Sequence, residues 1–102
     1  MKIKRLKKVL IGSAIWKIEW VKNSDNGSFD YVTEIIKIPA KGNTEVRIFE
    51  ILMHELKEII QCEQFTRLYG KSTEQQYVFV YNHDQHTDLC ARLSGLLSKF
   101  IK

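Results

Sequence analysis

The sequence predicts an α+β domain in which a small, mostly antiparallel sheet packs against two helices. Residues 13–22 alternate apolar and polar side chains, as a half-buried strand does. Residues 44–69 and 82–102 instead repeat apolar side chains three and four positions apart, which is the period of an amphipathic helix. With 102 residues, 44% hydrophobic and 27% charged, the chain is expected to form one globular domain over residues 1–102.

The first half is expected to contain the strands. In residues 13–22 the apolar face consists of Trp16, Ile18 and Trp20. The segment "NSDNGS" then predicts a tight turn through Asn26-Gly27, and residues 29–38 predict a second strand that ends at Pro39. Residues 3–11 are a third strand or the early part of the first.

The second half is expected to be mainly helical. The first helix should begin at residue 43 or 44 and end at Gly70. The run "QYVFVY" follows as a short strand, and Asn82 or Asp84 caps the last helix. The predicted order is therefore β-β-(β)-α-β-α.

The charge is uneven along the chain. The formal net charge is +4, and much of the excess lies in the opening segment "MKIKRLKK". Such a segment is suited to nucleic acid or an anionic surface, and Trp16 and Trp20 could assist in binding nucleic acid. The alternative is a charged edge strand that resists pairing with other chains.

The cysteines indicate the compartment. Cys62 and Cys90 are too few for a disulfide framework and fall on separate predicted helices, so both are expected to be reduced thiols. No stretch approaches the length of a transmembrane helix. We therefore expect a cytoplasmic location and no membrane partner.

A candidate metal site lies in "HELKE", residues 54–58. On a helix, His54 and Glu58 point within about 40° of each other, one turn apart, so both can reach one ion. Glu55 lies about 100° round from His54, where the H-E-x-x-H helix of zinc peptidases holds its general base. The alternative is a solvated helix face on which His54 simply pairs with Glu58.

A zinc site needs a third protein ligand, and His86 is the best candidate. It extends the inward leucine stripe of the last helix, and two histidines with Glu58 would give the His₂Glu set of known catalytic zinc sites. His86 could instead pack on a neighbouring helix. His83 is a rival ligand, and Asp88 could either ligate or orient an imidazole.

The order of a strand pair with "FDY" and "IIKI", then "ILMHELKEIIQ", then a histidine at the start of a leucine-periodic helix resembles the small zincin-like metallopeptidases encoded by phages and prophages. The resemblance runs from about Trp16 onward. It implies a minimal zincin-like fold, zinc as cofactor, and hydrolysis of peptide bonds in a peptide or protein substrate. His54, Glu58 and His86 would be the metal ligands and Glu55 the catalytic carboxylate, with an extended peptide lying along the strand "YVTEIIKI".

Two other functions remain open at this point. One is a binding module without catalysis that uses the basic N-terminus on nucleic acid. The other is a small phage assembly protein whose metal is structural or missing.

Overall fold

The computed structural model describes residues 1–22, 26–69 and 77–102. In chain order its elements are β1 (Lys8–Ile11), β2 (Ala14–Lys22), β3 (Ser28–Asp30), β4 (Ile35–Lys41), α1 (Glu45–Glu63), β5 (Arg67–Tyr69), β6 (Tyr77–Phe79) and α2 (His83–Ser98). The predicted α+β class is confirmed.

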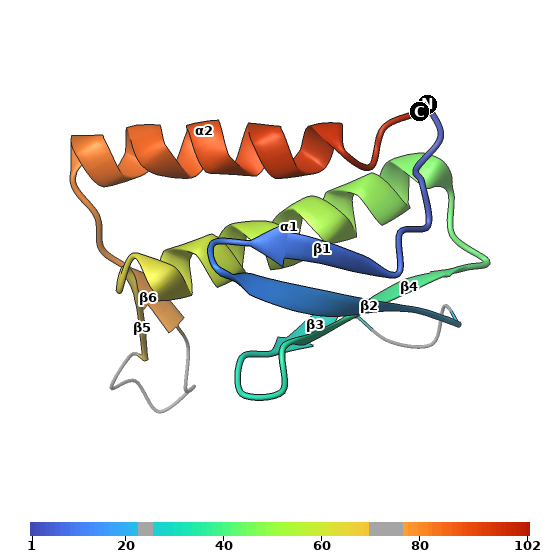
Figure 1. Ribbon diagram of the computed structural model, residues 1–102, viewed down its shortest axis with the longest axis horizontal. Helices are drawn as coiled ribbons and strands as arrows, with labels where there is room; N and C mark the ends of the chain where they lie inside the picture. Colours follow the sequence, from blue (N-terminus) through green and yellow to red (C-terminus); the bar gives the residue numbers. More distant parts are fainter. Residues whose placement is uncertain (23–25, 70–76) are drawn as a thin grey trace.

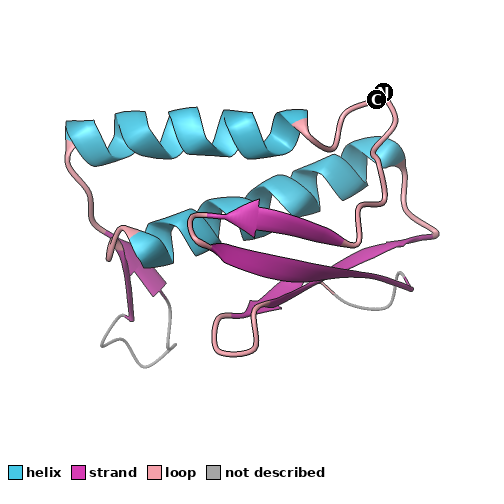
Figure 2. Ribbon diagram, in the orientation of Figure 1, coloured by secondary structure: helices cyan, strands magenta, loops and turns pink. Residues whose placement is uncertain are grey.

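Four strands form the main sheet in the order β1-β2-β4-β3, and β5 pairs with β6 in a separate two-stranded sheet. Both helices lie on the same side of the main sheet (Figure 1). Helix α1 packs on the sheet, and α2 packs chiefly on α1 (Figure 2). Three of the four strand pairs are antiparallel, as expected. The pair at the centre, β2 with β4, is parallel.

The tight turn predicted between residues 13–22 and 29–38 does not join two neighbouring antiparallel strands: β2 and β3 are not neighbours, and the pair that does form, β2 with β4, is parallel. A turn at residues 31–34 divides the second predicted strand into β3 and β4. Asp30 builds this turn, since its Oδ1 accepts from the N–H groups of Val32 and Thr33 at 2.9 and 3.1 Å. Glu34 then takes a left-handed φ of 59°. Residues 23–25 of the predicted Asn26-Gly27 turn lie outside the described residues.

Pro39 does not end the second strand, because β4 continues through it to Lys41. Proline has no N–H to donate, so it is tolerated where one side of a strand is not paired. β3 pairs only with residues 35–37 of β4, which leaves that side of β4 without a β3 partner at Pro39. Along residues 35–37 the edge of the main sheet is therefore β3 and not the strand "YVTEIIKI".

Helix α1 begins as predicted and ends earlier. The Thr44 side chain caps it by accepting from the N–H of Arg47. At the other end Phe65 takes a left-handed φ of 58°, and the N–H groups of residues 65 and 66 bond to the carbonyls of Cys62 and Gln61. This is a Schellman motif, in which glycine is the usual left-handed residue. Residues 67–69 therefore form β5, and Gly70, the expected end of the helix, lies outside the described residues.

The strand in "QYVFVY" and the last helix are confirmed as β6 and α2. Asn82 caps α2 in a capping box: its side chain accepts from the N–H of Gln85, and the Gln85 side chain accepts from the N–H of Asn82. After α2, the fully buried Phe100 meets the edge of the Trp20 ring. A backbone bridge between Ile3 and Ile101 joins the two ends of the chain (Figure 1).

One core residue of α1 predicts a gain in stability. Gln61 is 0% exposed, yet neither of its amide atoms has a hydrogen-bond partner among the described residues. Burying an amide without partners costs about 1–3 kcal/mol. Gln61→Met, which keeps the length of the side chain, is therefore expected to raise the free energy of unfolding by about that amount in urea denaturation.

The matched control is Gln64→Met. The Gln64 amide donates to the carbonyl of Gln85 at 2.9 Å and to Asp88 at 2.8 Å, so this variant should lose stability. A loss of stability in Gln61→Met as well would contradict the assignment of Gln61 as unpaired.

Candidate metal centre

Three metal-ligating side chains lie together on one side of α1. His54, Glu55 and Glu58 each offer a ligand atom, and these atoms lie within 4.8 Å of one another. No other histidine, cysteine, aspartate or glutamate joins them within the described part of the chain. The far side of the helix buries Leu52 and Leu56 completely, which holds the cluster on a rigid element.

His54 and Glu58 touch directly. The Nε2 atom of His54 lies 2.6 Å from Oε2 of Glu58. The His54 side chain is 70% exposed, whereas that of Glu58 is 15% exposed. This is the contact between residues four positions apart that the sequence predicts. It forms as a hydrogen bond between the two side chains, so its presence does not require a metal ion.

Glu55 is the buried member of the cluster. It is 4% exposed, and its Oε2 atom has no hydrogen-bond partner among the described residues. Burial raises the pKa of Glu55; the charges of His54 and Arg67 act against this rise, and that of Glu58 adds to it. A buried carboxyl oxygen without a hydrogen-bond partner is costly, and groups whose pKa is shifted by burial are concentrated at functional sites.

The backbone of Gly27 closes over Glu55. A Cβ atom added to Gly27 would lie 3.2 Å from Cγ of Glu55 and 2.5 Å from Cγ2 of Ile51. Only glycine permits so close an approach without movement of α1. The segment before β3 thus covers the buried side of the cluster.

Arg67 of β5 completes the site, although nothing in the sequence analysis predicts it. Its Nε atom donates to Oε1 of Glu58 at 3.1 Å. Its guanidinium carbon lies 3.5 Å from the ring centroid of Tyr77 and 5.1 Å from that of Phe29. Burial disfavours its charge, but the hydrogen bond to Glu58 and nearby negative charges outweigh burial and raise the pKa of Arg67.

The structure does not bring His86, the expected third ligand, to the cluster. His86 lies in the first turn of α2, where its ring stacks on Tyr81 with centroids 5.7 Å apart. This turn adjoins the end of α1, because Gln64 donates to the backbone of Gln85. Gln64 is ten residues beyond His54, or about 15 Å along the helix axis. Since zinc–nitrogen bonds are about 2 Å long, His86 and His54 are too far apart to share an ion in this arrangement.

The two alternative ligands also lie at the start of α2. His83 is the exposed first residue of the helix. Asp88 accepts from the Gln64 amide at 2.8 Å and lies 3.8 Å from the Arg92 guanidinium. The ligands that the structure groups therefore all come from the H-E-x-x-E helix.

A shallow groove of about 700 Å³ runs across this part of α1. Its lining includes Asn26 and Gly27 before β3, His54 and Glu55 of α1, and Leu93 of α2. This volume is within the usual range for ligand pockets. A bound ligand can thus contact the exposed His54 and the buried Glu55 together.

The cluster fits a divalent metal in part. One imidazole nitrogen and two carboxylates suit zinc and related metals, but they make three protein ligands only if Oε2 of Glu55, which has no hydrogen-bond partner among the described residues, also binds the metal. Against this, the positive Arg67 beside Glu58 repels a cation. The residues fit a metal held from one helix, with Arg67 as the competing counter-ion.

Within the described residues, neither α1 nor α2 combines the length and the apolar character that a membrane-spanning helix needs. Comparisons with known proteins gave no match: no family model fits the sequence, and no curated protein or solved structure is significantly similar to it. The resemblance to zincin-like metallopeptidases therefore rests on the residues of this chain alone.

Proposed function

We propose that this chain is a zinc-dependent peptidase of the zincin-like type whose metal is held by α1. The observation that carries the proposal is the convergence of His54, Glu55 and Glu58 within 4.8 Å, with one oxygen of the buried Glu55 left without a partner. A surface ion pair would account for His54 and Glu58. It would not account for a second carboxyl buried beside them.

His54 and Glu58 would be the two metal ligands that the cluster supplies, and Glu55 would be the general base; a third ligand would have to come from outside the cluster. A bound zinc ion would supply a water of lowered pKa and polarise the peptide carbonyl. Glu55 is suited to accept a proton because its raised pKa brings it toward neutral pH, where proton transfer in both directions is efficient. Glu55 would then pass the proton to the leaving amine.

The substrate would be an extended peptide in the groove over α1. The free edge of β3 borders the same region, since Gly27 immediately precedes β3 and contacts Glu55. An extended peptide can add to such an edge through backbone hydrogen bonds.

A non-catalytic role is the second candidate, and Arg67 favours it. The Arg67 guanidinium already neutralises Glu58 at 3.1 Å, as it would in a protein that has kept the zincin-like fold without a metal. In that case the groove would bind a partner without cleaving it.

Zinc titration of untagged, chelator-stripped protein separates the two candidates. The wild type should bind zinc, and His54→Ala should weaken binding at least about tenfold, equal to about 1.4 kcal/mol, because it removes the only nitrogen ligand of the cluster. Isothermal titration calorimetry measures both affinities.

His83→Ala and His86→Ala are the matched controls, since each removes one histidine at the start of α2. Both should bind zinc as the wild type does. Equal affinity in His54→Ala and His83→Ala would exclude the α1 site, and loss of zinc in His86→Ala would restore His86 as the third ligand.

A further inference from the structure

Positive charge is concentrated in one part of this fold. Residues 1–22, 35–41 and 99–102 contain eleven of the sixteen lysines and arginines but only one of the twelve acidic residues. The remaining residues carry a net negative charge, although the whole chain is at +4. The protein is therefore strongly polarised, and the proposed metal centre belongs to the acidic part.

The outer face of the main sheet carries one group of lysines. This face is turned away from α1 and α2, which lie together on the other side (Figure 2). The group consists of the exposed Lys8 on β1, Lys17 and Lys22 on β2, and Lys37 and Lys41 on β4. The register places Lys8 opposite Lys17 and Lys22 opposite Lys41.

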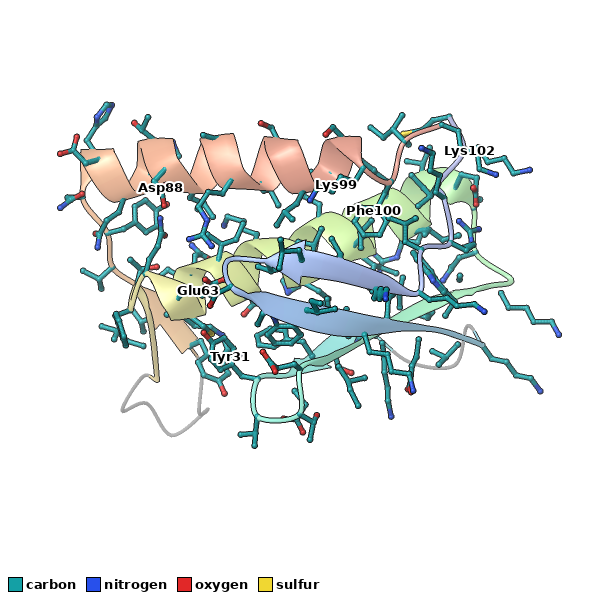
Figure 3. All side chains as sticks on the ribbon, viewed as in Figure 1. Tyr31, Glu63, Asp88, Lys99, Phe100 and Lys102 are labelled. Atoms are coloured by element: carbon teal, nitrogen blue, oxygen red, sulfur yellow. The ribbon has the colours of Figure 1, made fainter. Side chains whose placement is uncertain are left out.

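The joined termini carry a second group: the exposed Lys2, Lys4, Lys99 and Lys102. The backbone of residue 4 bonds to that of Phe100, and the backbone of residue 102 bonds to that of residue 2. Figure 3 shows Lys99 and Lys102 at this end of the molecule, with Glu63 and Asp88 at the other. β2, β4 and α2 end toward the termini (Figure 1). We call the first group, the lysines on the outer face of the main sheet, the basic face.

The basic face has little internal compensation. Glu19 is the one acidic residue in these segments; it contacts Lys17 at 3.7 Å, and the register places it opposite Lys37. Like charges directly opposite each other on neighbouring strands are destabilising. An anionic partner that neutralises Lys8 and Lys17 would remove this repulsion.

We propose that the basic face binds the phosphate backbone of double-stranded nucleic acid. Neutralising phosphates with lysines releases condensed counterions and supplies sequence-independent affinity. The proposal is independent of the metal centre, since none of the metal ligands belongs to the basic face.

The two tryptophans of β2 favour a duplex over a single strand as the partner of the basic face. Single-strand binding relies on exposed rings on which bases stack. Trp16 is 2% exposed, and the indole N–H of Trp20 donates to the carbonyl of Leu6 at 2.8 Å while Arg5 covers its ring at 5.3 Å. The expected use of these tryptophans on nucleic acid is therefore not supported, and what the basic face offers is charge.

The placement of the lysines also argues against a membrane as the partner. Proteins that lie on a membrane commonly use an amphipathic helix with a free apolar face. Here α1 and α2 bury their apolar faces against each other and the sheet, as the complete burial of Leu52 and Leu56 and the 2% exposure of Leu89 show. The basic lysines lie on strands and termini.

The test is fluorescence anisotropy of a labelled, mixed-sequence DNA duplex titrated with the metal-free full chain at several salt concentrations. The wild type should bind, with affinity falling as salt rises. Lys8→Gln/Lys17→Gln should reduce the slope of log affinity against log salt by about 1.8, since each phosphate contact contributes about 0.9. It should also weaken binding about tenfold or more at low salt.

Arg47→Gln/Lys57→Gln is the matched control. It removes the same charge from exposed positions of α1 and should leave the slope unchanged. Circular dichroism confirms folding of both variants. The proposal is overturned if the wild type does not bind the duplex at low salt, if both double variants lose slope equally, or if the protein binds phosphatidylserine vesicles and not the duplex.

Discussion

Glu55→Gln is expected to abolish peptide hydrolysis while zinc binding persists. General-base catalysis contributes about 10²- to 10⁴-fold to a rate, and glutamine cannot accept the proton. Its amide keeps the size of the side chain and a carbonyl oxygen, so the cluster should keep its shape. The measurement is kcat on a peptide that the wild type cleaves, together with zinc affinity.

The same variant should be more stable than the wild type at neutral pH. Because burial raises the pKa of Glu55, the native metal-free protein holds a proton that the unfolded chain releases. The free energy of unfolding is then greatest below 4.5, the ordinary pKa of a glutamate, and falls as pH rises toward the higher native pKa. Glutamine has no proton to release in this pH range, so the free energy of unfolding of Glu55→Gln should not fall in this way.

Denaturation of both proteins with chelator present, from pH 4 to pH 8, gives the comparison. The stability advantage of Glu55→Gln should be small at the acidic end and grow with pH. Glu19→Gln, on the outer face of the main sheet, is the control. Its stability relative to the wild type should not grow with pH in this way. Loss of zinc in Glu55→Gln would instead identify Glu55 as a ligand, and a wild-type rate would remove it from the mechanism.

Arg67→Met should have opposite effects on the metal-free fold and on zinc affinity. It leaves Glu58, whose side chain is 15% exposed, without its cationic partner and removes the contacts with Tyr77 and Phe29. Breaking a fully buried ion pair costs about 3–5 kcal/mol; this pair is only partly buried and Glu58 keeps its contact with His54, so a smaller loss of about 2 kcal/mol is expected in the metal-free state. Zinc should bind about tenfold more tightly, because no positive charge then competes for Glu58.

Arg67→Lys provides the control for charge. It keeps the positive charge but not the planar group that packs between two rings, so it should lose part of the stability and gain no zinc affinity. Chemical denaturation with chelator and calorimetric zinc titration give the two quantities. Unchanged zinc affinity in Arg67→Met would show that Arg67 does not compete with the metal.

Local sequence patterns were enough to predict the strand of residues 14–22, both helix starts and the meeting of His54 with Glu58. Each depends on the geometry of one element. Alternation of side chains places Trp16 and Ile18 inward, and four residues make about one helical turn. The hydrogen-bonding side chains at Thr44 and Asn82 mark where the helices begin.

The partners of these elements could not be predicted in the same way. The short turn centred on Asp30 and Glu34 places β4 beside β2 in parallel, and a stretch that alternates well does not show which strand it will join. The early end of α1 depends on Phe65 in a left-handed conformation, which the sequence does not signal because glycine is the usual residue there. The left-handed Phe65 reverses the chain direction after α1, so β5 lies beside α1 and Arg67 reaches Glu58.

Packing between elements likewise decides which polar side chains are buried and which charged residues from distant parts of the chain lie close together. Glu55 is a charged residue of "HELKE", in which Leu56 is the one apolar residue, and it is buried because Gly27, 28 positions earlier, lies against it. His86 lies away from the cluster because α2 runs antiparallel along α1 and begins at its far end. Lysines from both termini meet because residues 3 and 101 pair. Spacing along the chain determines contacts within one helix or strand, whereas contacts between elements depend on how their apolar faces are buried together.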